Sequence, residues 1–102
     1  MSHSPQLLKT DLKITVIDDL GNIQEGATVR LFLTEKDFKE ETNAILPKEK
    51  GTDKKGVIWF KDLEARAYYV LAESGDKNNW GGGTKTDVLK SKKVNKVNIV
   101  VD

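Results

Sequence analysis

The two ends of the chain carry the clearest hydrophobic pattern, an alternation of apolar and polar side chains. In residues 11–18, and again in residues 95–102, apolar side chains recur at every second position. A period of two is typical of a β-strand with one buried face. The sequence therefore predicts two strands, whose inward sets are Leu12, Ile14 and Val16 near the start and Val97, Ile99 and Val101 near the end.

A third alternating segment, residues 26–34, predicts another strand with Val29, Leu31 and Leu33 facing inward. Phe32 falls on the opposite face of this strand. A large apolar side chain there needs cover, so we expect an adjoining loop or a partner to lie over it.

Two runs in the middle of the chain predict a β-hairpin. Residues 57–63 and 68–72 are rich in β-branched and aromatic side chains, and a polar corner at 53–56 precedes them. Both faces of each run carry large apolar residues. The hairpin is therefore expected to lie centrally, with its outer side partly covered.

The remaining segments predict shorter elements. Residues 35–41 are charged apart from Phe38, which predicts a turn or two of helix crossing one end of the sheets rather than a core helix. Short strands are predicted at residues 42–47, where Pro47 ends the strand, and at residues 84–89.

These segments together predict an all-β fold. We expect an Ig-like or prealbumin-like two-sheet sandwich of about seven short strands, with a short helix near residues 35–41. A length of 102 residues fits one domain, which we assign to residues 9–102. Residues 1–8 are polar and contain a proline, so they are expected to be a disordered arm or a remnant of cloning.

Composition argues against several function classes. The 17 lysine and arginine residues nearly balance 16 acidic residues, so no overall field attracts nucleic acid or an anionic membrane. Cysteine is absent, and the one histidine, His3, lies in the arm, which removes thiolate zinc sites and cysteine nucleophiles. Neither a Gly-x-Ser-x-Gly elbow nor a phosphate-binding loop occurs. We therefore predict a non-catalytic protein with no cofactor and no metal.

The acidic corner after the first strand has two interpretations. Asp18, Asp19 and Asn22 offer the oxygen ligands that calcium binds. Leu20 and Gly21 break the ligand spacing of a calcium loop. A turn in which the acids bond nearby backbone amides is therefore favoured.

The glycine-rich residues 74–83 hold the main candidate for ligand binding. Trp80, beside Asn78 and Asn79, offers a rigid aromatic surface that can stack on a sugar ring or insert into a partner. In the alternative interpretation, its side chain folds back and closes one end of the sandwich.

Trp59 and Tyr69 raise the same question within the predicted hairpin. Together with Phe32 and Leu71, they either form one apolar outer patch or are covered by residues 35–50. The predicted binding residues are thus Trp80, Asn78, Asn79, Trp59 and Tyr69.

Several motifs follow one another within residues 12–72. They are the strand and turn at 12–22, the Glu-Gly-Ala-Thr-Val-Arg-Leu strand at 25–31, the Thr-Asp-Lys-Lys-Gly turn at 52–56 leading to Phe60 and Leu63, and Tyr68. Their order resembles that of carboxypeptidase regulatory-like, or transthyretin-like, domains and, more loosely, the collagen-adhesin B-type repeats of bacterial surface proteins. The resemblance implies a seven-stranded prealbumin-like sandwich, usually a non-catalytic module of secreted or cell-surface proteins.

The adhesin repeats often cross-link a lysine of the first strand to an asparagine or aspartate of the last strand, assisted by an acid on the tyrosine-bearing strand. The matched lysine and acid positions are Val16 and Ala72 here. Both are apolar, so the matched positions do not predict this cross-link, although Lys13 and Asn98 stand nearby in their strands.

The resemblance therefore implies an extracytoplasmic module, periplasmic, secreted or on the cell surface, that acts as a structural spacer or a protein-binding domain. The alternative is a carbohydrate-binding module that uses an exposed tryptophan. The expected partner is a protein or a glycan and not nucleic acid, and contact with a membrane is expected at most through a lipid anchor outside this sequence.

Overall fold

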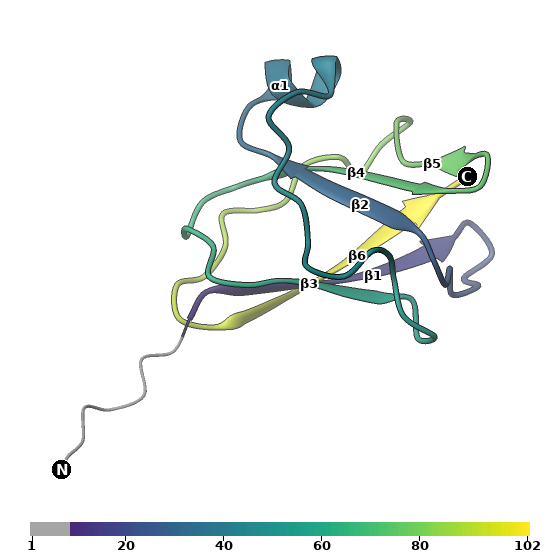
Figure 1. Cartoon of the computed structure of the whole chain (residues 1–102), viewed down its shortest axis with the longest axis horizontal. Coiled ribbons are helices and arrows are strands. Elements are labelled where there is room, and N and C mark those ends of the chain that lie inside the picture. Colours follow the sequence, from purple (N-terminus) through teal and green to yellow (C-terminus); the bar gives the residue numbers. More distant parts are fainter. Residues whose placement is uncertain (1–8) are drawn as a thin grey trace, which may run out of the picture.

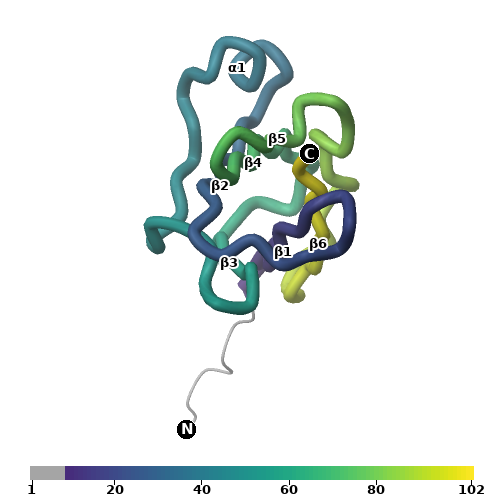
Figure 2. The backbone as a smooth tube through the Cα atoms, turned by 90° about the vertical axis from the view of Figure 1, so that its right-hand side faces the viewer, coloured from purple at the N-terminus to yellow at the C-terminus, as the bar shows by residue number. Residues whose placement is uncertain are grey.

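The computed structural model describes residues 9–102, which form two small β-sheets and one short helix. The strands are β1 (Asp11–Asp18), β2 (Thr28–Phe32), β3 (Val57–Phe60), β4 (Tyr69–Ser74), β5 (Lys77–Asn78) and β6 (Val94–Val101), and the helix is α1 (Glu35–Glu40). One sheet has the strand order β3-β1-β6 and the other β2-β4-β5, and they lie as two layers (Figure 1, Figure 2). The predicted all-β sandwich with a short helix is confirmed. The predictions for residues 1–8, including His3, lie outside the described residues.

The core forms where the alternating faces of the two sheets meet. The following side chains are at most 4% exposed, and the first four were predicted to point inward: Ile14, Val29, Leu31, Ile99, Phe60 and Tyr68. Leu33 is an exception, because it is 37% exposed. β2 ends at Phe32, and Thr34 already caps α1, so the alternation stops before Leu33.

β3 and β4 do not form the predicted hairpin, because they belong to different sheets. β3 pairs with β1, where Trp59 lies opposite Lys13, whereas β4 pairs with β2. The link between them is held beside β1, since the amide of Leu63 donates to the carbonyl of Thr10 at 2.8 Å. Each strand thus joins a separate sheet and buries an apolar face in the shared core.

Tyr68, immediately before β4, fastens this crossing between the sheets. Its hydroxyl donates to the carbonyl of Glu64 and accepts from the amide of Glu64, both at 3.0 Å. The arrangement is like the tyrosine corner of Ig-type sandwiches. Burial raises the pKa of the Tyr68 hydroxyl, which is consistent with its structural role.

α1 covers the outer face of the β2-β4-β5 sheet. The hydroxyl of Thr34 accepts the amide of Asp37 at 3.0 Å, and the helix ends at Glu41 in the left-handed conformation, with φ 53°. Phe38 then packs edge-on against Phe32, with 5.8 Å between the ring centroids. Phe32 is fully buried, so the prediction that an adjoining segment covers it is confirmed.

Two of the predicted short strands are each reduced to a single bridge, Ile45 opposite Leu31 and Lys85 opposite Tyr69. Pro47 lacks the amide proton that a longer ladder would need in the first segment. β5 (Lys77–Asn78) lies in the glycine-rich residues 74–83, where no strand was predicted. Residues 9–102 thus contain six strands, against about seven predicted.

β1 and β6, the first and last strands, run parallel and are paired along all of the 8 residues of each. The described chain therefore enters at one end of the sandwich and leaves at the other (Figure 1). Just after β6, Asp102 exchanges two backbone hydrogen bonds with Asn78, at 3.0 and 3.2 Å, which join the two sheets at this edge.

Candidate functional site

Four of the five predicted binding residues lie in or beside β4 and β5, and an aromatic cluster forms around two of them. Trp80 lies 4.6 Å from Phe38 between ring centroids, and Phe38 lies 5.9 Å from Tyr69. We call Phe32, Phe38, Tyr69, Leu71 and Trp80 the helix-side cluster. Trp80 nevertheless remains 40% exposed. Its ring thus packs against α1 on one side and is open to a partner on the other.

Asn79 is buried, at 2% exposed, and its side chain serves the protein's own backbone. Its Oδ1 accepts the amide of Ala72 at 2.9 Å, and its Nδ2 donates to the carbonyl of Val70 at 2.9 Å and to that of Gly83 at 3.4 Å. The side-chain amide thereby takes the place of a peptide group of a neighbouring strand. Asn79 holds the Trp80 loop against β4, a role that sequence reasoning missed.

Asn78 and Tyr69 frame the same loop from the surface. Oδ1 of Asn78 accepts the amide of Trp80 at 3.0 Å, which orients the tryptophan backbone. The Lys85 ammonium lies 5.4 Å from the centroid of the Tyr69 ring. A binding role for these residues remains a prediction.

Trp59 stands apart from the other four, on the β3-β1-β6 sheet. The single outer patch of Trp59 with Phe32, Tyr69 and Leu71 therefore does not form. Those three residues pack with Phe38 of α1, so the second interpretation, cover by residues 35–50, applies to them.

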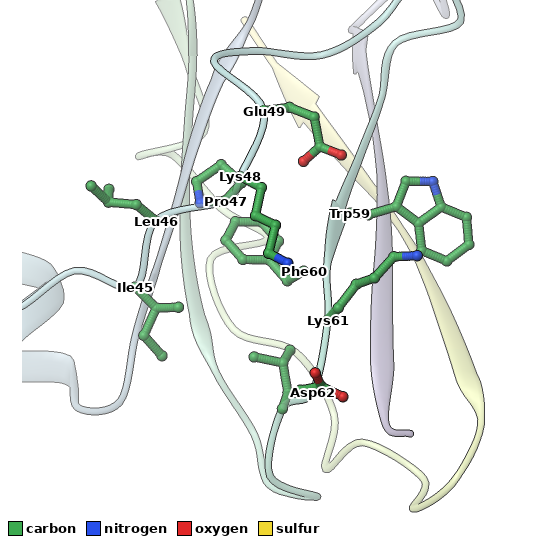
Figure 3. A pocket seen from close by; sticks show the side chains of 10 residues that line it. Ile45, Leu46, Pro47, Lys48, Glu49, Trp59, Phe60, Lys61 and Asp62 are labelled. Atoms are coloured by element: carbon green, nitrogen blue, oxygen red, sulfur yellow. The ribbon is translucent and has the colours of Figure 1, made fainter. Parts of the chain in front are cut away.

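A cleft of about 160 Å³ lies next to Trp59, between residues 45–49 and residues 59–63 (Figure 3). Its apolar lining comes from Ile45, Leu46, Pro47, Phe60 and Leu63 and its charged lining from Lys48, Glu49, Lys61 and Asp62. Because side chains of both charges line it, the cleft favours neither a cation nor an anion. Its apolar wall suits an uncharged apolar group. Sequence reasoning missed it, because its two walls come from separate segments.

The acidic corner after β1 is the predicted turn. Oδ1 of Asp18 accepts the amides of Leu20 and Asn22, at 3.0 and 2.8 Å, and Oδ2 accepts the Asn22 side-chain amide at 3.1 Å. The Lys77 ammonium lies 3.4 Å from Oδ2. The hydrogen bond from the backbone amide of Asn22 is the main cause that lowers the pKa of Asp18 from 3.8 to about 2.

This turn predicts a pH dependence of stability. Because its folded pKa is lowered, ionised Asp18 contributes stability fully above pH 3.8, and the contribution is lost as the pH falls toward about 2. Urea unfolding of the unaltered chain and of Asp18→Asn should therefore show a difference in midpoint that shrinks over this range. Asp19→Asn, at an exposed neighbouring position, is the control. A difference for Asp18→Asn that stays constant down to pH 2 would contradict the assignment.

Within residues 9–102, no group of three or more histidine, cysteine or acidic side chains is placed to hold a metal ion. No helix of this part of the chain is long and apolar enough to cross a membrane.

Comparison with known proteins supports the fold. No protein-family model and no curated protein matches the sequence. Among solved structures, the chain is similar to a variant of BcpA, the major pilin subunit of Bacillus cereus, with a TM-score of 0.52 and 18% sequence identity. The chain shares its fold with part of a pilin subunit. The match covers 92% of this chain and 30% of the pilin chain.

The positions matched to the adhesin cross-link lie in the core of this pilin-like fold. Val16 and Ala72 are both fully buried and aliphatic. Lys13 lies on the opposite face of β1, next to Trp59, and Asn98 of β6 pairs with Thr15 rather than with Lys13. The matched core positions therefore hold neither an amine nor a carboxylate.

Proposed function

We propose that this chain is a non-catalytic structural domain of a bacterial surface or secreted protein, located outside the cytoplasm, where it acts as a load-bearing spacer. The similarity in fold to part of a major pilin subunit supports this. Since the chain spans 30% of that subunit, the role of the whole pilin is carried over only as part of the proposal.

The parallel pairing of β1 and β6 is the observation on which the proposal rests. A longer polypeptide would enter at one end of the sandwich and leave at the other (Figure 1). Tension between these ends pulls the two strands in opposite directions along their common axis. The hydrogen bonds between them then resist together, whereas strands pulled apart from one end separate bond by bond.

The ionisable groups with shifted pKa values also point to structure rather than catalysis. Asp18 and Tyr68 serve a turn and the sheet crossing described above. The pKa of Asp53 is lowered mainly by the backbone amides of Val57 and Lys55, with a smaller contribution from the charge of Lys13. Shifted groups that gather in a cleft would favour an enzyme, but these three each hold a local backbone feature.

Single-molecule force spectroscopy tests the proposal. The chain lacks cysteine, so one introduced thiol gives a unique attachment point. Pulling through the two termini should need a clearly higher force than pulling through the N-terminus and Ser91→Cys. Ser91 lies before β6, so the second geometry loads β1 and β6 from the same end. Equal forces in the two geometries would refute a load-bearing role for this strand pair.

A further inference from the structure

The outer face of the β3-β1-β6 sheet carries a line of residues that crosses all three strands. Trp59, Lys13 and Lys96 lie directly opposite one another in register. The ammonium groups of Lys61 and Lys13 lie 5.2 and 5.9 Å from the Trp59 ring centroid. Figure 3 shows the Lys61 side chain reaching the edge of the indole. We call Lys61, Trp59, Lys13 and Lys96 the cationic row.

Ion pairing does not account for the cationic row. Over residues 9–102, none of its three lysines takes part in an ion pair. Lys13 and Lys96 lie directly opposite each other, and like charges in that position destabilise a sheet. The row thus concentrates positive charge on a protein with a net charge of only +1.

The acids that adjoin the row form their hydrogen bonds and ion pairs with groups outside the row. Asp62 lies 3.6 Å from the ammonium of Lys9, and Asp11 accepts the amide of Asp62 at 3.1 Å. Asp53 accepts two amides of its own turn, at 2.8 and 2.9 Å. Glu49, across the cleft, is the acid that points toward Trp59 (Figure 3). None of the three lysines forms an ion pair with these acids, although the charge of Lys13 acts on Asp53. An anionic ligand would therefore meet three lysines on the row, with the carboxylates of Asp53 and Glu49 nearby.

This sheet face is open, unlike that of the other sheet. The outward residues of β6 are all exposed, among them Val94 at 46% and Val100 at 45%. On the β2-β4-β5 sheet, by contrast, α1 buries Phe32 and Leu71. On the cationic row, Lys61 and Lys96 are exposed, whereas Lys13 and Trp59 are half-buried. A ligand can thus approach the row from the side of β6.

We propose that the cationic row binds an anionic polysaccharide, with a sugar ring against Trp59 and its carboxylate or sulfate groups on the lysines. An aromatic ring flanked by cations matches a polymer in which flat apolar ring faces and charges alternate. Non-specific binding of single-stranded nucleic acid uses several aromatic platforms in a positive groove, whereas this row has one. An acidic peptide without aromatic or proline side chains would leave the Trp59 ring uncovered. The spacer function needs no ligand, so this inference goes beyond it.

Calorimetric titration of the full chain with oligogalacturonate, a carboxylated glycan, tests the proposal, with heparin as the sulfated probe and dextran as the neutral one. Lys13→Gln/Lys96→Gln should weaken binding about tenfold or more and reduce its salt dependence. Lys36→Gln/Lys39→Gln, the same charge change on α1, should leave the affinity unchanged. Glu49→Gln should tighten binding, because it removes the carboxylate that faces Trp59.

The proposal predicts binding of oligogalacturonate or heparin, and which of the two binds more tightly identifies the anion. Trp59→Ala should also weaken binding, with its fold checked by circular dichroism. The proposal would be overturned if the unaltered chain bound neither anionic glycan, or if the two double variants behaved alike. Equal or tighter binding of polyglutamate, single-stranded DNA or dextran would overturn it as well.

Discussion

Replacing Asn79 with alanine is expected to lower the free energy of unfolding by about 3 kcal/mol. The Asn79 side chain satisfies the amide of Ala72 and the carbonyl of Val70, each at 2.9 Å, inside the protein. Its removal leaves both buried backbone groups without a partner, and an unsatisfied buried group costs about 1–3 kcal/mol. Urea denaturation, followed by far-UV circular dichroism, measures the change.

Two further variants separate this role from a general effect of mutation in the loop. Asn78→Ala removes a neighbouring side-chain bond at the surface and should cost about 1 kcal/mol or less. Asn79→Asp keeps the acceptor for Ala72 but places an oxygen against the Val70 carbonyl, so it should also destabilise. If Asn79→Ala were no more harmful than Asn78→Ala, the loop would not depend on this side chain.

Replacing Phe38 with alanine is expected to cost about 3 kcal/mol, at the low end for a buried aromatic residue. Phe38 is 5% exposed and contacts three aromatic rings of the helix-side cluster, those of Phe32, Tyr69 and Trp80. Its loss uncovers the fully buried Phe32 and removes the surface on which Trp80 rests. Thermal unfolding should show the loss in stability, and tryptophan fluorescence should shift to the red.

Lys36→Ala on the same helix is the matched control, since Lys36 is exposed. Phe38→Leu should recover much of the stability, because it restores apolar volume over the sheet, but not the aromatic contacts. Full stability of Phe38→Ala would mean that α1 is not what covers this sheet.

The sequence predicted much of the core because strand periodicity is a local property. Val29 and Leu31 point inward wherever their strand pairs, and the unusual outward position of Phe32 correctly required cover by another segment. The prediction that Leu33 points inward was wrong because the strand ends before it. The next residue, Thr34, is the N-cap of α1, and the alternation of apolar side chains does not show where such a cap ends a strand.

Strand pairing was harder to predict than strand position. The segments around Trp59 and Val70 are equally suited to a hairpin and to strands of two different sheets. The choice depends on contacts far apart in the sequence, such as the amide of Leu63 on the carbonyl of Thr10. The pattern of apolar and polar residues within one segment does not show such contacts.

The candidate sites show the same limit. Trp80 and Trp59 stand out in the sequence as aromatic residues near turns or on an outward face, but the cationic row joins Lys13, Trp59 and Lys96 from three separate strands. Asn79 looked like a loop residue free to bind a ligand. Its burial becomes visible only when the loop folds back on β4.

The pairing of β1 with β6 also governs when the molecule can fold. β1 is the central strand of its sheet, yet one of its two neighbours is the last strand of the described chain. During synthesis, β1 cannot complete its pairing until β6, at the end of this segment, has emerged from the ribosome. Such a high contact order places folding among the slower small proteins, in milliseconds to seconds, and leaves an unpaired hydrophobic edge open to chaperones until the final strand arrives.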